Sequence, residues 1–176
     1  MQAVLLDALG TLVELEPPWE RLAGHPERVR AAFRAEMAYY RAHSIEGRDE
    51  ASLADLRERC AALVSRELGR EVGVEELMAA IRFRAFDDAA AALEELRGRG
   101  LRLVVVSNWD YALPEVLERV GLIDLLDGVV TSAGVGAAKP DPAIFRQALR
   151  LAGCESDTAL HVGDIASLAE LGNMLG

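Results

Sequence analysis

Short apolar runs alternate with stretches of helical periodicity along most of the chain. Four mainly apolar runs occur at residues 4–6, 101–106, 128–131 and 159–162. Continuous runs of this length are typical of strands that are buried on both faces of a parallel sheet. Apolar residues at helical spacing fill the segments 89–96, 113–120 and 144–151 between them. The pattern therefore predicts an α/β fold, a doubly wound parallel sheet with right-handed crossovers.

The segment between the first and second runs breaks this alternation. Beyond Pro17 and Pro18, residues 19–86 contain helical patterns only. One helix is predicted after His25-Pro26-Glu27, a second after the capping-box-like stretch 52–55, and a third over 74–83. We interpret this segment as an all-helical insertion into the α/β fold. A last, weakly patterned helix is predicted over 165–175.

Charge and composition narrow the classes of partner. The chain of 176 residues has a net charge of -10 and no basic tract, which argues against nucleic acid and anionic membrane surfaces. Its two cysteines, Cys60 and Cys154, lie far apart and lack metal-ligand spacing. No leader pattern precedes the first strand and no apolar run approaches membrane-spanning length. We therefore expect a cytoplasmic protein.

Polar side chains follow the apolar runs. Asp7 follows the first run, Ser107 and Asn108 end the second, Asp164 follows the fourth, and Lys139 lies in the loop after the third. In open parallel sheets the loops at the carboxyl ends of the strands border one crevice, where ligands bind. Each residue also has a structural interpretation as a turn, a helix cap or a solvated charge. Their common placement favours a shared site.

These residue types suit phosphoryl chemistry. An aspartate such as Asp7 can attack phosphorus, and two carboxylates, here with Asp164, can hold Mg²⁺. Lysine and hydroxyl groups bind phosphoryl oxygens as charge develops on them. Lys139 is the single lysine in a chain whose other cations are arginines, which suggests a site that needs a compact ammonium group. Gly10 permits a close turn beside Asp7, and Thr11 offers a hydroxyl and an N–H there.

Four motifs in order carry a family resemblance. They are Asp7-Ala8-Leu9-Gly10-Thr11-Leu12, Ser107-Asn108, Lys139-Pro140-Asp141-Pro142-Ala143-Ile144-Phe145 and His161-Val162-Gly163-Asp164. The chain resembles the haloacid dehalogenase-like hydrolase superfamily, in the group with a helical cap inserted after the first strand. The resemblance implies a Rossmann-like core formed by residues 1–14 and 87–176, with residues 15–86 as the cap that closes over the site.

The resemblance also implies roles for the residues of the site. Asp7 would be the nucleophile and, with Asp164 and the backbone carbonyl of Leu9, a ligand of Mg²⁺. Lys139 would be the second catalytic residue and bind the phosphoryl group. The remaining substrate-binding set is Ser107, Asn108, Thr11 and Gly10. The implied activity is Mg²⁺-dependent hydrolysis of a small phosphorylated metabolite through an aspartyl-phosphate intermediate.

Two departures from the family pattern leave alternatives open. Leu9 stands where the phosphatases carry a second aspartate as general acid and base, so turnover is expected to be slow. A halide leaving group needs no proton, which leaves a 2-haloacid dehalogenase as an alternative, together with a non-catalytic binding protein. A phospho-accepting receiver is disfavoured because it does not explain the long helical insertion.

The second departure lies at the end of the chain. Leu168 and Ala169 stand where the family carries a further acidic residue, and the segment 165–176 differs from the family continuation. The sheet edge left bare there is expected to be covered by the final helix or by a second subunit, which would make a homodimer.

Overall fold

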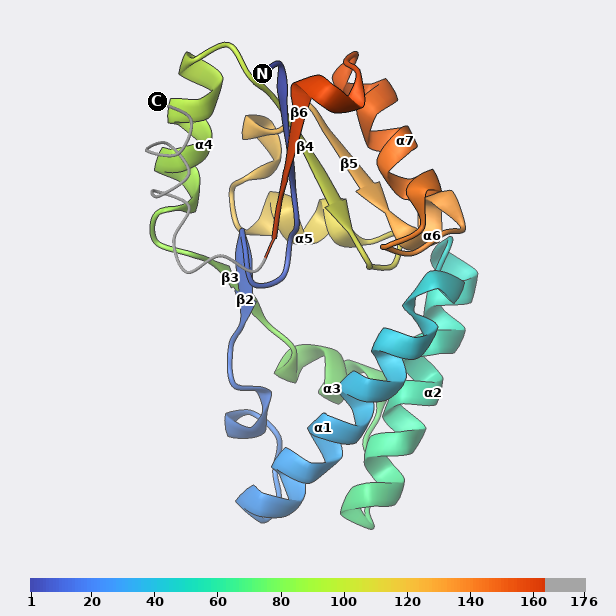
Figure 1. The fold of residues 1–176 in the computed structure, drawn as a ribbon. Coiled ribbons are helices and arrows are strands. Elements are labelled where there is room, and N and C mark those ends of the chain that lie inside the picture. The colour runs from blue at the N-terminus through green and yellow to red at the C-terminus, as the bar shows by residue number, and fades with distance from the viewer. Residues whose placement is uncertain (164–176) are drawn as a thin grey trace.

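A parallel sheet forms the centre of the computed structural model, which describes residues 1–163 (Figure 1). Its four strands run in the order β5-β4-β1-β6. Leu5 lies opposite Val104 on one side and His161 on the other. Their bounds are β1 Ala3–Leu6, β4 Arg102–Ser107, β5 Gly128–Thr131 and β6 Ala159–Val162. The predicted doubly wound α/β fold is confirmed, with its strands at the predicted positions.

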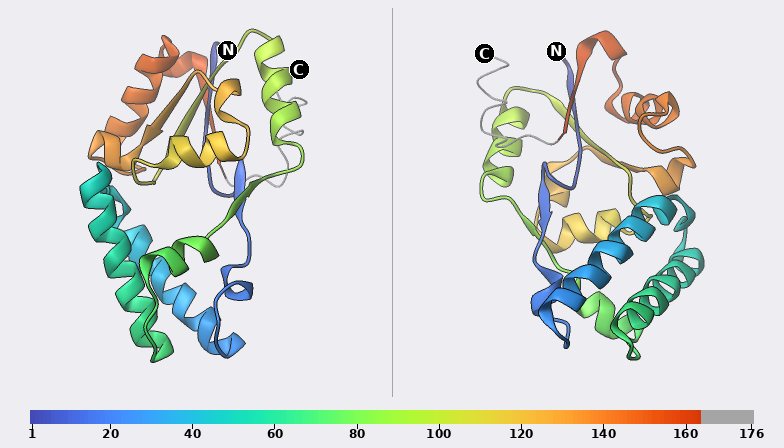
Figure 2. Two further views of the ribbon diagram at one scale, coloured as in Figure 1. Left: turned by 180° about the vertical axis from the view of Figure 1, so that it is seen from behind. Right: turned by 60° about the horizontal axis from the view of Figure 1, so that its bottom comes forward.

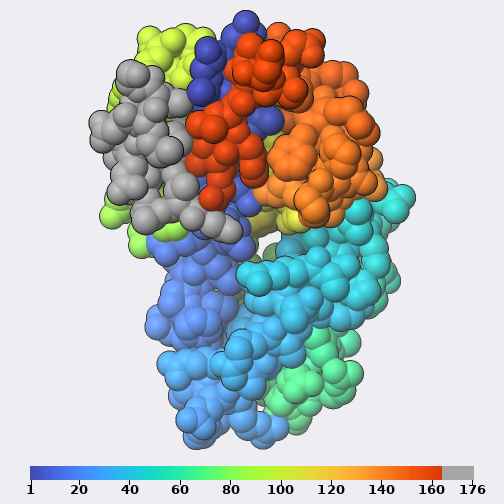
Figure 3. Space-filling view, in the orientation of Figure 1, coloured from blue at the N-terminus to red at the C-terminus, as the bar shows by residue number. Residues whose placement is uncertain are grey.

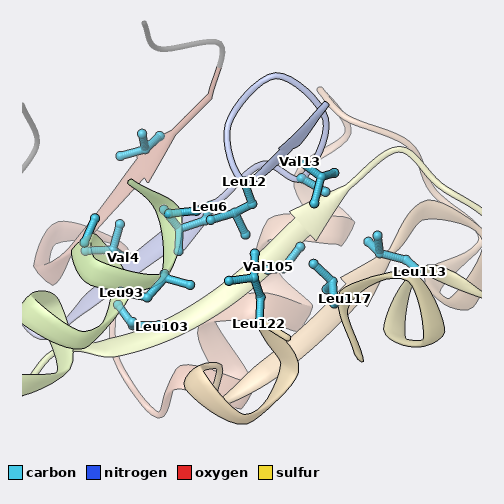
Figure 4. Close-up of a cluster of buried hydrophobic side chains, with 14 of the residues drawn as sticks. Val4, Leu6, Leu12, Val13, Leu93, Leu103, Val105, Leu113, Leu117 and Leu122 are labelled. Atoms are coloured by element: carbon cyan, nitrogen blue, oxygen red, sulfur yellow. The ribbon is translucent and has the colours of Figure 1, made fainter. Parts of the chain in front are cut away.

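Helices cover both faces of this sheet, as the sequence predicts. On one face lie α4 (Ala89–Gly98) and α5 (Leu113–Arg119), and on the other lies α7 (Pro142–Ala152) (Figures 1 and 2). Alternate strand residues point to opposite faces. Thus Leu6 joins the cluster under α4 and α5, whereas Leu5 joins the cluster under α7. The first of these clusters is drawn in Figure 4.

The helices of the insertion gather beyond the carboxyl ends of the strands (Figures 1 and 2). Three α-helices, α1 (Pro26–His43), α2 (Glu50–Leu68) and α3 (Val74–Ala80), pack together with the short helix η1 (Pro18–Glu20). Their apolar faces enclose a cluster of buried side chains separate from those of the sheet. The short helix η2 (Ser44–Glu46) joins α1 to α2 and contacts α6 (Ser132–Val135).

Two predictions about local structure are wrong. The third helix ends at Ala80 rather than at residue 83, because residues 83–85 form a strand, β3 (Phe83–Ala85). This strand pairs antiparallel with β2 (Val13–Leu15) and makes a two-stranded ribbon where the chain enters and leaves the cap helices. The predicted capping box at 52–55 also differs, since α2 begins at Glu50 and its capping box is formed by Asp49 and Ser52.

The remaining connections are short helical turns. They are η3 (Ile123–Leu125) before β5 and η4 (Ser156–Thr158) before β6. Among residues 1–163, β6 is an edge strand of the four-stranded sheet. The predicted helix 165–175 and the residues Asp164, Leu168 and Ala169 lie outside the described residues. In the described part of the chain, no helix has the length and apolar character needed to cross a membrane.

Candidate active site

Asp7 lies at the carboxyl end of β1, and hydrogen bonds fix both its backbone and its side chain. Its backbone N–H donates to the carbonyl of Val162 at 2.8 Å, which continues the pairing with β6. Its Oδ1 accepts hydrogen bonds from the Ala8 N–H and from the Ser107 hydroxyl, both at 2.8 Å. The carboxylate therefore has a fixed orientation at the junction of β1 with β4 and β6.

Lys139 completes the contacts of this carboxylate. Its Nζ lies 2.6 Å from Asp7 Oδ2, and both side chains are largely buried, with exposed fractions of 14% for Lys139 and 21% for Asp7. The backbone of Lys139 is fixed by Asn108, whose Oδ1 accepts from the Lys139 N–H at 2.6 Å and whose Nδ2 donates to the Lys139 carbonyl at 3.2 Å. The Lys139–Pro140 peptide is cis.

The other two predicted substrate-binding residues, Gly10 and Thr11, lie in the turn after β1. Gly10 adopts a φ of 82°, a conformation that favours glycine, and its N–H donates to Val13. Thr11 is buried, and its N–H donates to the Ala8 carbonyl at 3.3 Å. Neither Gly10 nor Thr11 lines the cavity described next, so the structure brings together Asp7, Ser107, Asn108 and Lys139 but not these two residues.

A cavity of about 530 Å³ lies between the ends of the strands and the cap helices. The surface is hollowed between the cap helices and the core (Figure 3). Asp7, Ser107, Asn108 and Lys139 lie on its core side. Its volume is within the range of about 300–1,000 Å³ that is common for small-molecule sites. The cap side is mainly apolar, with the residues Met37, Leu53, Leu56, Leu77, Met78 and Ile81.

The structure adds functional candidates that sequence reasoning missed. The Tyr40 hydroxyl donates to Asp110 Oδ2 at 2.6 Å, and Asp110 Oδ1 accepts from the Ala112 N–H at 2.8 Å. Burial raises the pKa of the Asp110 carboxyl, although these two hydrogen bonds oppose the shift. Burial and the neighbouring Asp110 charge raise the pKa of Tyr40. Both residues line the cavity, so they join the cap to the core beside it.

A second buried pair lies on the cap side of the cavity. Glu36 on α1 is only 3% exposed, and the thiol of Cys60 on α2 hydrogen-bonds to its carboxyl group. Burial raises the pKa of Glu36, and the hydrogen bond from Cys60 opposes the shift. Burial, followed by the charge of Glu36, raises the pKa of Cys60 to about 12. The sequence contains one signal for Glu36, because it lies three residues after Phe33 on an otherwise apolar helical stripe.

The expected magnesium ligands are partly within the described chain. Asp7 and Leu9 line the cavity, whereas Asp164 lies outside the described residues. A Cβ on Gly163 would lie 3.4 Å from Asp7 Cβ and 3.7 Å from Asp7 Oδ2, so glycine leaves space beside the carboxylate. A carboxylate and a backbone carbonyl are the oxygen donors that Mg²⁺ prefers. Within residues 1–163, no group of three or more His, Cys, Asp or Glu side chains is arranged to hold a metal.

Comparisons with known proteins agree with this geometry. A family model described as haloacid dehalogenase-like hydrolase matches residues 1–169. Human haloacid dehalogenase-like hydrolase domain-containing protein 3 is 49% identical over 82 residues, which cover 47% of this chain and 33% of that protein. Glyceraldehyde 3-phosphate phosphatase of Methanothermobacter thermautotrophicus is 38% identical over 87 residues, which cover 46% of this chain and 36% of that protein. The matches thus span about a third of the length of these curated relatives.

Solved structures show the same fold. An L-2-haloacid dehalogenase structure superposes with a TM-score of 0.71 at 24% identity, covering 92% of this chain and 77% of the other. The family model covers nearly the whole chain, and its fold is the one found here. The chain therefore belongs to the haloacid dehalogenase-like hydrolase family.

Proposed function

We propose that this chain is a Mg²⁺-dependent phosphatase that hydrolyses a small phosphate monoester with Asp7 as nucleophile. The observation that carries the proposal is the contact of one carboxylate with both Lys139 Nζ, at 2.6 Å, and the Ser107 hydroxyl, at 2.8 Å, on a cavity wall. An anionic phosphoryl group at this place would meet a nucleophile, a cation and a hydroxyl donor together.

In the first step, an Asp7 carboxylate oxygen attacks the phosphorus of the ester. The bond from phosphorus to the ester oxygen breaks, and the leaving group departs with the electron pair of that bond. Lys139 and Ser107 stabilise the charge on the phosphoryl oxygens. Asn108 fixes the Lys139 backbone, so it acts as a positioning residue in this step.

In the second step, water attacks the aspartyl phosphate, which regenerates Asp7 and releases inorganic phosphate. Leu9 lines the cavity beside Asp7 and cannot donate or accept a proton. The leaving oxygen must therefore take its proton from solvent, and the attacking water must lose its proton to solvent. Esters of acidic alcohols, such as aryl phosphates, are accordingly the best substrates, because they depart without protonation.

Asp7, the Leu9 carbonyl and Asp164 would hold the Mg²⁺ ion. When bound, Mg²⁺ supplies neutralisation of the phosphoryl charge. The space beside Asp7 that Gly163 leaves supports this assignment. A relative with 38% identity bears the name of a phosphatase, which supports phosphate esters as the substrate class.

Two further expectations remain proposals. The cysteines of the described chain, Cys60 and Cys154, are free thiols, which supports a reducing compartment such as the cytoplasm. Among residues 1–163, β6 is an edge strand, which supports a homodimer in which a second subunit covers that edge.

The test is release of phosphate from 4-nitrophenyl phosphate, with and without Mg²⁺. Wild-type protein should show metal-dependent turnover, and Asp7→Asn should abolish it. Asp87→Asn makes the same substitution at a side chain that is 99% exposed, and should retain full turnover. Turnover that survives in Asp7→Asn would overturn the assignment of the nucleophile, and no turnover by folded wild-type protein would overturn the phosphatase.

Leu9 favours one other candidate, a dehalogenase, because a halide leaves without protonation. The same Asp7 would attack carbon and displace the halide, and water would then hydrolyse the resulting ester. Metal-independent release of chloride from 2-chloropropionate, lost in Asp7→Asn, would replace the phosphatase proposal by this one.

A further inference from the structure

The cap side of the cavity determines which leaving group fits beside the phosphoryl site. Three helices contribute to it at helical spacing, with Glu36 and Tyr40 one turn apart on α1 and Leu56 and Cys60 one turn apart on α2. Most of the other lining residues of these helices are aliphatic or Met. This wall therefore favours a mainly apolar leaving group with few polar contacts.

Glu36 is the one carboxylate among the cap residues that line the cavity, whose other polar members include Tyr40, Arg41 and Arg57. Its side chain is 3% exposed, and its Oε2 atom is buried without a hydrogen-bond partner among the described residues. The other two buried or half-buried carboxylates of the cavity are satisfied: Asp7 by Ser107 and Lys139, and Asp110 by Tyr40 and Ala112. A buried acceptor that is left unpaired has a cost in stability, because it has lost its hydrogen bonds to water. An aliphatic side chain among these apolar neighbours would avoid that cost.

The position of Glu36 relates it to the site. Tyr40 marks the point where α1 meets the core, through its hydrogen bond to Asp110, and Asp110 follows Ser107 by three residues. Glu36 lies four residues, about one helical turn, before Tyr40, so along the helix axis it is about 6 Å farther from that contact. A group that begins at Asp7 and extends along the cavity would therefore pass Tyr40 before reaching Glu36.

We propose that Glu36 is a specificity-determining residue, whose carboxyl group accepts a hydrogen bond from a hydroxyl or amino group at the far end of a mainly apolar leaving group. The proposal rests on the proposed function, since it places the phosphoryl end of the ester at Asp7, Ser107 and Lys139. The donor on the substrate satisfies the acceptor that the folded protein leaves unpaired. A site built around such a bond discriminates strongly against an analogue that lacks the donor.

The test compares esters that differ only in this donor. The substrates are 4-(hydroxyalkyl)phenyl phosphates with side chains of increasing length, beside 4-alkylphenyl and 4-(aminoalkyl)phenyl phosphates of equal length. Wild-type protein should prefer a donor-bearing ester over its alkyl counterpart by at least about 10-fold in kcat/KM at the matching length. Glu36→Leu should abolish or reverse that preference while phenyl phosphate is still hydrolysed.

Two variants sharpen the result. Glu36→Gln keeps an acceptor oxygen, so it should retain a preference for the hydroxyl ester and lose any additional preference for the amine. Glu27→Gln makes the same change at an exposed position on α1 and should leave every ratio unchanged. Equal ratios in wild type and Glu36→Leu would overturn the role of Glu36.

A binding measurement separates this inference from the proposed function. Calorimetry with the non-hydrolysable 4-(hydroxyalkyl)benzylphosphonates and their alkyl counterparts reports the same preference without turnover. A preference that Glu36→Leu abolishes, in a protein that hydrolyses no ester, would support Glu36 as the specificity residue and overturn the phosphatase alone. Hydrolysis without any preference would overturn the role of Glu36 alone.

Discussion

The Tyr40 hydroxyl donates a 2.6 Å hydrogen bond to Asp110 Oδ2, which ties the cap helix α1 to the loop after β4. A backbone hydrogen bond lies beside it, from the Tyr111 N–H to the Gly47 carbonyl at 2.9 Å. The loop that brings Ser107 and Asn108 to the Asp7 carboxylate and to Lys139 thus also contacts the cap. Substitutions that alter the contact between Tyr40 and Asp110 should therefore change both the stability and the activity of the protein.

Removal of the Tyr40 hydroxyl should destabilise the protein. Tyr40→Phe leaves the Asp110 carboxylate, which is 5% exposed, with the Ala112 N–H as its remaining described donor. We expect the free energy of unfolding in urea to fall by about 2 kcal/mol. Tyr39→Phe is the matched control, because the Tyr39 hydroxyl accepts a hydrogen bond from Arg59 of α2 and has no contact with Asp110, and the change should cost less than about 1 kcal/mol. Equal losses in the two variants would contradict the prediction.

A methyl group at Gly47 should separate the cap from the core. A Cβ there would lie 2.9 Å from Asp110 Cβ and 3.3 Å from Leu53 Cδ1, so neighbouring atoms must shift. Gly47→Ala should lower the free energy of unfolding by about 1–3 kcal/mol. At Gly98, at the end of α4, a Cβ meets nothing within 4 Å, and Gly98→Ala should stabilise by about 0.5 kcal/mol. An unchanged free energy of unfolding in Gly47→Ala would show that the neighbouring atoms can shift without destabilising the protein.

Glu36 should make the stability of the protein fall as pH rises. Burial raises its folded pKa above the ordinary value of 4.5, so the folded protein binds the proton more tightly than the unfolded chain does. Its contribution is fully present below pH 4.5 and is lost as pH rises toward the raised folded pKa. The slope in this window approaches about 1.4 kcal/mol per pH unit.

Urea unfolding at a series of pH values measures this effect. Glu36→Gln carries no titrating group, so the difference in free energy of unfolding between this variant and wild type should grow with pH and then level off. Curves that stay parallel from pH 4 to pH 8 would show that Glu36 does not titrate differently in the folded and unfolded states.

An acid at position 9 should restore proton transfer to the leaving group. Leu9 lines the cavity beside Asp7, so a carboxyl group in its place would lie near the departing oxygen. Leu9→Asp should raise the turnover of alkyl phosphates by about 100-fold and that of aryl phosphates much less. Leu9→Asn has the same shape without the acid and should raise neither. Equal changes for the two classes of ester would contradict the role of protonation.

The strands of the sheet could be predicted from the sequence because they are buried on both faces and are therefore continuously apolar. The run Leu103-Val104-Val105-Val106, for example, indicates a strand even when the neighbouring strands are unknown. The ribbon of β2 and β3 could not be predicted from the sequence, since each strand has three residues and the two are about 70 positions apart. Their pairing depends on the path of the intervening cap, and the apolar residues Ile81 and Phe83 extend the preceding helical pattern.

The catalytic end of the site was predictable for a similar reason. Asp7, Ser107 and Lys139 lie at or after the carboxyl ends of strands that the α/β pattern predicts, and the structure places Ser107 and Lys139 in contact with Asp7. The cap end of the site could not be predicted, because Tyr40 and Asp110 are 70 residues apart and their contact depends on how the cap helices pack against the core. Gly10 and Thr11 were predicted in the site because they are close to Asp7 in sequence, but neither lines the cavity.

The chain has one lysine, and that residue is Lys139, with its Nζ against Asp7 on the cavity wall. Amine-directed reagents therefore have a single side-chain target, apart from the α-amino group at the start of the chain. A ligand that fills the phosphoryl end of the cavity should shield this amine from modification. Mass spectrometry of the labelled protein thus offers a direct titration of site occupancy, which requires neither turnover nor a chromogenic substrate.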